Sequence, residues 1–303
     1  MEESLLVTGI ITTYKREPRF VQRAARSILN QTYQNIELII VDDSPSDFEQ
    51  RDEVKRIAES LGENVRYIQH KMNQGACAAR NTGISMAKGA IIGFLDDDDE
   101  WHEDKVSSML PLFENNPEIA LVYCGSVAID ENKKSTTNII KIFERGYIYD
   151  RLLFENFIGS TSFPLIRKKC LESVGGFDTA MLSSQDYDVW LRLCKKYKVN
   201  STPKQLVYYY IHAGDQISKN FKRLVNGHEK IINKNLDALK KNNKAYAERL
   251  ACLAPEYAGD GKIVKSIFTA FYTLFKNPFR GYENIRMLYS MFVNYKMYRK
   301  RKL

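Results

Sequence analysis

The sequence predicts an α/β protein in which a mostly parallel sheet carries helices on both faces and is followed by a helical extension. The order of apolar and amphipathic segments, together with the length of the chain, leads to this prediction. Apolar runs of strand length alternate with amphipathic segments of helix length through roughly the first 130 residues. This βαβ order gives parallel sheets, because each helix crosses from one strand to the next. With 303 residues, the chain can form one large domain or two smaller ones.

The elements follow from apolar runs and from helical spacing. Strands are expected over residues 5–12, 36–41, 65–69, 90–95, 119–129 and 207–211. Helices are expected over residues 18–29, 76–88, 103–114, 185–197 and 218–250. A further, polar helix is expected after Pro45 and ends at about residue 61. The alternation weakens after about residue 130. We therefore expect one α/β domain over residues 1–215, with halves of about 1–130 and 131–215, and a helical, basic extension over 216–303.

Charge is distributed unevenly along the chain. The formal net charge is +8, and residues 257–303 carry ten Lys and Arg against two Asp and Glu. Residues 1–256 are therefore balanced and offer no basic track for a nucleic acid. The basic tail predicts an anionic partner for the tail alone.

The five cysteines are single, without a CxxC pair. This pattern argues against a disulfide framework or a zinc site and favours a reducing compartment. Acidic residues stand near the N-terminus, where a secretion signal needs basic ones, and no run of about 18 apolar residues occurs. We expect a cytoplasmic protein.

The most informative segment is the run Asp96–Asp99, which ends the apolar strand 90–95. Four adjacent carboxylates repel one another unless water or a cation compensates them. Oxygen-rich clusters suit Mg²⁺ or Mn²⁺, which commonly carry phosphates, and ligands of open α/β sheets bind where strands end. The alternative is a solvated acidic loop.

Other polar residues also lie at the ends of strands or the beginnings of helices. Neither a GxGxxG turn nor a GxxxxGK[ST] loop follows the first strand, which disfavours dinucleotide and P-loop sites. Asp43 can accept from a base or ribose, or cap the next helix. In 73–81, Gly75 allows close approach of a ligand and Arg80 can contact an anion, although an ordinary loop-to-helix join also fits. Asp186 opens a helix as a cap would, and His212 alone fits a structural role.

Taken in order, these motifs are far more specific. Thr-Thr-Tyr follows strand one and Val-Asp-Asp-Ser ends strand two; then come Asn-Gln-Gly…Ala-Arg-Asn, Phe-Leu-Asp-Asp-Asp-Asp-Glu-Trp, Gly-Gly-Phe-Asp and Gln-Asp-Tyr-Asp-Val-Trp. The order resembles the family 2 glycosyltransferases of the GT-A fold over about residues 5–215. The resemblance implies a nucleotide-diphospho-sugar donor, usually a UDP-sugar, and a divalent metal, Mn²⁺ or Mg²⁺.

The resemblance also implies roles for individual residues. The residues expected to bind the donor are Thr12, Tyr14, Arg16, Asp43, Gly75, Arg80, Asp96 and Asp98. Among them, Asp43 matches the aspartate that binds uracil in the family. The metal falls to Asp98, Asp99 and His212, and Asp97 is the expected spectator. The sugar and acceptor pocket falls to Gly159, Ser160, Thr161, Gln185 and Trp190.

Asp186 matches the catalytic base of the family, which is normally preceded by glutamate. Here Gln185 precedes it, so the base is kept and one neighbouring carboxylate is lost. A carboxylate base and a metal suit an inverting transfer to a hydroxyl of a growing surface glycan, namely capsule, cell wall or a lipid-linked oligosaccharide. The alternatives are a sugar nucleotidyltransferase and a non-catalytic protein that binds nucleotide sugars.

The tail has a helical apolar stripe. It runs through Val264, Phe268, Phe271 and Phe275 and resumes around Phe292 before a basic end. An interfacial helix on an anionic membrane, on the inner face of the cell membrane, would have this composition. A helical pair packed on the domain or on a second subunit of a homo-oligomer is the alternative.

Overall fold

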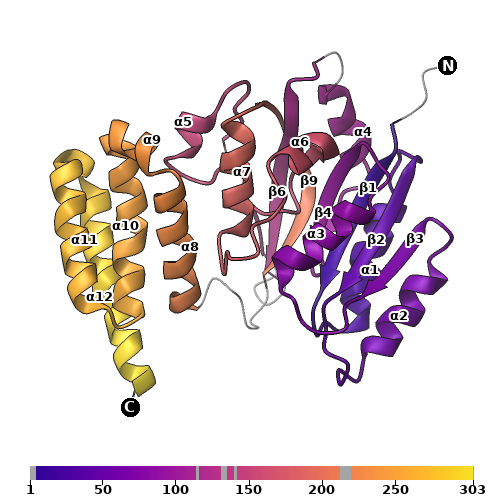
Figure 1. The fold of residues 1–303 in the computed structure, drawn as a ribbon, viewed down its shortest axis with the longest axis horizontal. Coiled ribbons are helices and arrows are strands. Elements are labelled where there is room, and N and C mark those ends of the chain that lie inside the picture. The colour runs from indigo at the N-terminus through magenta and orange to yellow at the C-terminus, as the bar shows by residue number, and fades with distance from the viewer. Residues whose placement is uncertain (1–4, 114–115, 131–134, 140–141, 212–219, 303) are drawn as a thin grey trace. The chain divides into compact units, whose positions relative to one another are not determined.

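The computed structural model describes residues 5–113, 116–130, 135–139, 142–211 and 220–302 (Figure 1). The chain divides into two compact units. The first comprises Met1–Ile148, Phe157–Thr179 and Val189–Ala213. The second comprises Tyr149–Asn156, Ala180–Asp188 and Gly214–Leu303.

The first unit contains a nine-stranded sheet. Its strands are β1 (Val7–Thr13), β2 (Ile36–Asp42), β3 (Val65–Gln69), β4 (Ile91–Asp96), β5 (Glu100–Trp101), β6 (Ile119–Asp130), β7 (Ser135–Asn138), β8 (Leu165–Arg167) and β9 (Lys198–Ile211). They lie in the order β3-β2-β1-β4-β8-β6-β9-β5, and β7 pairs with β6. Strands β3, β2, β1 and β4 are parallel, as are β6 and β9, whereas β8, β5 and β7 run antiparallel to their neighbours.

Helices cover both faces of this sheet. The helices of the unit are α1 (Pro18–Leu29), α2 (Arg51–Ser60), α3 (Ala76–Met86), α4 (Lys105–Met109) with the 3-10 turn η1 (Leu110–Phe113), α6 (Lys168–Ser173) and most of α7 (Gln185–Cys194).

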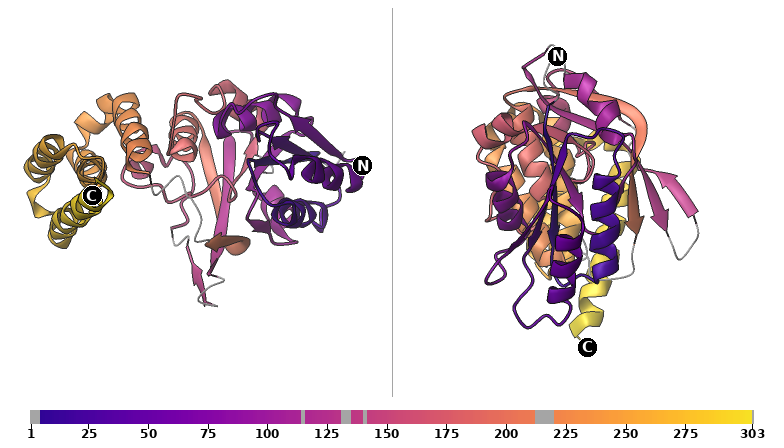
Figure 2. Two further views of the ribbon diagram at one scale, coloured as in Figure 1. Left: turned by 90° about the horizontal axis from the view of Figure 1, so that it is seen from below. Right: turned by 90° about the vertical axis from the view of Figure 1, so that its right-hand side faces the viewer.

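Two glycines show how α1 and α3 pack on opposite faces of β1. A Cβ on Gly9 would lie 2.7 Å from Cγ2 of Ile28 in α1, and a Cβ on Gly83 in α3 would lie 2.5 Å from Cγ2 of Ile10. Adjacent strand residues point to opposite faces, so α1 lies on one face of β1 and α3 on the other (Figure 2). The α/β prediction is confirmed.

Several predicted elements have different bounds. The single helix expected over residues 218–250 is divided into three, Phe221–Lys234, Leu236–Lys241 and Asn243–Gly259. The helix expected over 103–114 is the short α4 followed by η1, because Pro111 has no N–H to continue an α-helix. The aromatic strand expected over 207–211 is only the end of β9, whose earlier part is polar. The remaining predicted strands match observed ones within two residues.

The second unit is helical. It contains α5 (Tyr149–Leu152), the start of α7, α8 (Phe221–Lys234), α9 (Leu236–Lys241), α10 (Asn243–Gly259), α11 (Ile263–Lys276), η3 (Pro278–Arg280) and α12 (Tyr282–Lys302). Helices α11 and α12 pack on α10 through a small core of Ala251, Ala254, Ala270 and Met287. None of the described helices combines the length and apolarity that crossing a membrane requires.

Candidate active site

The aspartate run forms a tight turn at the carboxyl end of β4. The N–H of Asp99 donates to the carbonyl of Asp96 at 3.0 Å, which closes the turn. Asp96 is paired in register with Thr12 of β1, so the ends of two central parallel strands meet here. This edge is where an open α/β sheet builds its ligand site.

Arginine side chains compensate much of the negative charge. Arg16 bridges two carboxylates, with Nε 2.8 Å from Asp97 and a terminal nitrogen 2.8 Å from Asp98. Arg80 of α3 donates to Asp96 at 3.1 Å, and Arg23 of α1 donates to the carbonyl of Asp98 at 2.6 Å. These contacts exclude the reading of the run as a simple solvated loop.

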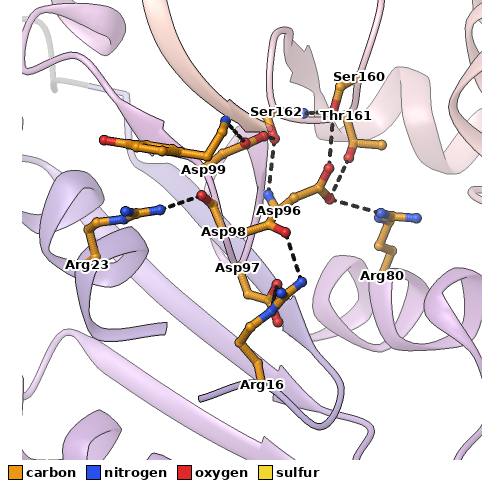
Figure 3. A network of polar contacts seen from close by, with 11 residues as sticks. Arg16, Arg23, Arg80, Asp96, Asp97, Asp98, Asp99, Ser160, Thr161 and Ser162 are labelled. Carbon is orange, nitrogen blue, oxygen red and sulfur yellow. Dashed lines mark hydrogen bonds and ion pairs between the residues drawn. The ribbon is translucent and has the colours of Figure 1, made fainter. Parts of the chain in front are cut away.

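A loop between α5 and β8 binds the same carboxylates from the other side. The hydroxyls of Ser160 and Thr161 each donate to Asp96 at 3.1 Å. The Ser162 hydroxyl donates to Asp99 at 2.7 Å and accepts the N–H of Asp96 at 3.1 Å. Residues 63 or more positions apart in the sequence are therefore joined into one network (Figure 3).

Lys105 lies beneath this loop and was not among the predicted site residues. It is fully buried, and its ammonium group donates to the carbonyls of Ser162 and Phe163 at 2.7 and 3.0 Å. The Lys105 ammonium group also lies 4.6 Å from the centroid of the Trp101 ring. A buried lysine needs such partners. Nothing in its sequence position, in the first turn of a helix, distinguishes it from a surface residue, whereas Ser162 could have been found by extending the predicted pair Ser160–Thr161.

Burial and mutual repulsion raise the pKa values of two of the aspartates. Burial raises the pKa of Asp97 to about 7, although Arg16 opposes the shift. Burial, followed by repulsion from Asp96 and Asp98, raises the pKa of Asp99 well above its usual value. Asp96 and Asp98 are the accessible members, with side chains 33% and 23% exposed.

Asp43 and the loop before α3 form a second part of the site. The Asp43 carboxylate accepts hydrogen bonds from the backbone N–H groups of Gln74 and Gly75, at 2.8 and 2.7 Å. It also lies 2.8 Å from Nδ1 of His70. Asp43 is only 3% exposed. It therefore fixes the loop that begins α3, and with it the helix that carries Arg80.

The remaining predicted residues of the first unit differ in exposure. Tyr14 is 49% exposed and Thr12 is half-buried at the end of β1. Trp190 is fully buried, and its indole nitrogen donates to the carbonyl of Gly159 at 3.0 Å. Trp190 thus supports the loop that carries Ser160 and Thr161.

Gln185 and Asp186 lie in the second unit, at the start of α7. Asp186 is half-buried; its carboxylate accepts the N–H of Tyr187 at 2.7 Å and the side-chain amide of Asn156 at 3.5 Å. Gln185 donates to the carbonyl of Met181 at 3.1 Å. His212 lies outside the described residues, two positions after Tyr210, whose N–H donates to Asp99 at 3.2 Å.

The donor set suits a hard divalent cation. Among the described residues, no three His, Cys, Asp or Glu side chains are grouped so as to hold a metal ion by themselves. Mg²⁺ sites commonly use one or two carboxylates and complete the coordination with substrate phosphates and water. Asp98 and Asp96, partly exposed carboxylates at a strand end, fit such a site.

Comparison with known proteins identifies relatives over most of the chain. The family model for Glycosyl transferase family 2 matches residues 8–175. A protein of Escherichia coli K12, named as a colanic acid biosynthesis glycosyl transferase, WcaA, is 29% identical over 81% of this chain and 87% of its own length. An uncharacterized glycosyltransferase of Haemophilus influenzae is 32% identical over 69% of each chain.

Solved structures share the fold. S. aureus TarS 1–349, crystallised in complex with UDP-GlcNAc, superposes with a TM-score of 0.64 at 16% identity, covering 98% of this chain and 92% of that one. A longer S. aureus TarS structure gives a TM-score of 0.63 at 14% identity, covering 98% of this chain and 55% of that one.

Proposed function

Because the chain belongs to glycosyl transferase family 2 and has the GT-A fold, we propose that it transfers a sugar from a UDP-sugar to a hydroxyl of a growing surface glycan, with inversion. The acceptor would be capsule, cell-wall or lipid-linked oligosaccharide. The name of the E. coli relative, which refers to colanic acid biosynthesis, supports a glycan of this kind.

One observation carries the donor side of the proposal. The Asp96–Asp99 turn is held at the carboxyl end of β4 by arginines on one side and by Ser160–Ser162 on the other. This places accessible carboxylates and guanidinium groups at the edge of the sheet, where a diphosphate with its cation would bind. The UDP-GlcNAc complex of TarS, which shares the fold, makes UDP the first nucleotide to test.

We assign the base to Asp186. In a single displacement the acceptor oxygen forms a bond to the anomeric carbon, the bond from that carbon to the diphosphate breaks, and the hydroxyl proton passes to the carboxylate. The Asn156 amide, which contacts Asp186, would orient that carboxylate. Gln185 adds no second negative charge beside it.

A divalent cation, when bound, would neutralise charge on the departing diphosphate. We propose Asp98 as its direct ligand and His212 as a second. Asp99, only 1% exposed, would support Asp98 from beneath. The tyrosine two positions before His212 is already bonded to Asp99, which favours this assignment.

The proposed functional division is residues 1–215 for transfer and 216–303 as an extension. All five cysteines are free and four are buried, which is compatible with the cytoplasm as the proposed site of reaction. Light scattering of the purified protein would show whether it forms a homo-oligomer.

The first experiment is a thermal-shift panel of UDP-, GDP- and dTDP-sugars with and without Mn²⁺. A ligand that binds only the folded state raises the melting temperature. We expect UDP compounds to do so, mainly when the metal is present. Equal shifts by all three nucleotides, or none with UDP, would contradict the donor assignment.

The second experiment tests the base. Asp186→Asn should lower the release of UDP from UDP-sugars by at least about a hundredfold, since general-base catalysis contributes roughly 10²–10⁴. It should leave the UDP-induced thermal shift intact. Gln185→Glu is the matched control and should retain turnover. Near-normal turnover by Asp186→Asn would remove Asp186 from this role.

A further inference from the structure

The second unit exposes an extended apolar face on its last two helices. On α11, five large side chains point away from the core at helical spacing: Val264, Ile267, Phe268, Phe271 and Phe275, between 45% and 78% exposed. The opposite side of α11 is buried through Ser266, Ala270 and Thr273. The apolar face is therefore not the face used for packing within the unit.

Helix α12 repeats this arrangement. Its buried residues, Asn284 and Met287, lie on the side packed in the unit, whereas Ile285, Tyr289 and Phe292 are 54% to 67% exposed. The turn between the helices adds Phe279, which is 94% exposed. Contiguous exposed apolar surface of this kind marks an interaction site in soluble proteins.

The same stripe of α12 becomes basic towards its end. Lys296, Arg299 and Lys300 are exposed and continue the spacing of Ile285, Tyr289 and Phe292. The Lys296 ammonium lies 4.3 Å from the centre of the Phe292 ring. Over residues 257–303 only two acidic residues oppose ten basic ones, and both acids already pair with neighbouring basic side chains.

We propose that the α11–α12 face, defined by these exposed residues, docks the protein on an anionic lipid bilayer surface. Aromatic and aliphatic side chains would enter the headgroup region, and the basic end would meet anionic headgroups. A second copy of this chain is a poorer occupant. Symmetric dimers bring the same patch of both subunits together, so two strongly basic surfaces would face each other.

The proposal is independent of the transfer reaction, and its test reads vesicle binding alone. The full-length protein is floated with vesicles of phosphatidylcholine, with or without one third phosphatidylglycerol. We expect flotation with the anionic vesicles, weakened by added salt. No flotation with anionic vesicles at low salt would overturn the proposal.

Two variants separate the apolar and basic contributions. Phe268→Ser with Phe271→Ser should weaken vesicle binding by about tenfold or more. Lys296→Gln with Arg299→Gln and Lys300→Gln should weaken it by roughly fivefold for each charge removed. All variants must melt as the parent does, so that loss of binding is not loss of folding.

Matched controls change the same chemistry elsewhere. Lys240→Gln with Lys241→Gln and Lys244→Gln removes three exposed charges, and Met86→Ser with Tyr147→Ser removes two exposed apolar side chains. Both should bind as the parent does. Equal loss in the controls, or a dimer in lipid-free light scattering that the Phe268 and Phe271 changes dissociate, would assign the face to another role.

Discussion

At the scale of single residues, the four aspartates divide into two kinds. Asp96 and Asp98 are partly exposed, whereas Asp97 and Asp99 are buried, with only 6% and 1% of their surface exposed. Asp97 is bound to Arg16 and Asp99 to Ser162. Two carboxylates are therefore accessible from solvent, and the contacts of the other two hold the turn in place.

Ser162 is the residue that joins the turn to the loop. Because its hydroxyl donates to buried Asp99 and accepts from Asp96, Ser162→Ala should lower the free energy of unfolding by about 1–3 kcal/mol. Ser126→Ala is the control, since the Ser126 hydroxyl is buried and has no hydrogen-bond partner among the described residues. Urea unfolding measures both. A similar change in the two variants would deny Ser162 this role.

Lys105 supplies a pH signature. Burial lowers the pKa of Lys105 to about 8 in the folded protein, from an ordinary value of 10.5, although Asp99 opposes the shift. Between about pH 8 and 10.5 the unfolded chain therefore holds a proton that the folded protein has lost, and the stability of the parent should rise with pH.

The variant Lys105→Met lacks this titration. The difference in unfolding free energy, parent minus variant, should therefore increase from about pH 8 towards pH 10. Lys204→Met, at an exposed lysine, is the matched control. A difference for Lys105→Met that stays constant over this range would show that the buried ammonium is not destabilised.

At the scale of elements, apolar runs of strand length were enough to predict the central strands. β1, β2 and β4 are buried on both faces and read as continuous apolar runs. β8 has only three residues, and the first half of β9 is polar, so neither gives a periodic signal. The motifs led to candidate site residues at the ends of strands, but the contacts of Ser162 and Lys105 with this region depend on the tertiary fold, which no local pattern encodes.

The loop before α3 depends on a backbone conformation that only glycine adopts easily. Gly75 has φ +88° and ψ 157° at the N-terminus of α3. Gly75→Ala should lower the free energy of unfolding by about 1–3 kcal/mol. The loss would come from backbone strain alone, because the added Cβ would meet no neighbouring atom. It should also reduce the thermal shift induced by UDP and Mn²⁺.

Gly62→Ala separates strain from ligand binding. Gly62 also has positive φ, +121°, and its Cβ would meet nothing, but it follows α2, away from the loop that Asp43 holds. The variant should lose stability and keep the UDP-induced shift. Loss of the shift in both variants would mean that destabilisation alone explains the effect of Gly75→Ala.

At the scale of the whole molecule, the two units carry different chemistry. The first holds the Asp96–Asp99 turn and the arginines that bind it, whereas Gln185 and Asp186 lie in the second, and residues 1–256 have balanced charge. The end of the second unit holds the basic charge and the exposed apolar face. Donor binding and surface binding should therefore be separable, because each depends on its own set of side chains.

Hydrogen exchange tests this separation in the intact protein. UDP with Mn²⁺ should slow exchange in residues 73–75, 96–101 and 159–163, where ligand contacts would restrict opening, and leave α11 and α12 unchanged. Anionic vesicles without nucleotide should slow exchange in α11 and α12 and leave the three site segments unchanged. EDTA should remove the first effect and leave the second, since only the nucleotide site would need a metal. Protection of α11 and α12 by UDP, with no change at residues 96–101, would place the nucleotide on the second unit and contradict the site built on the aspartate turn.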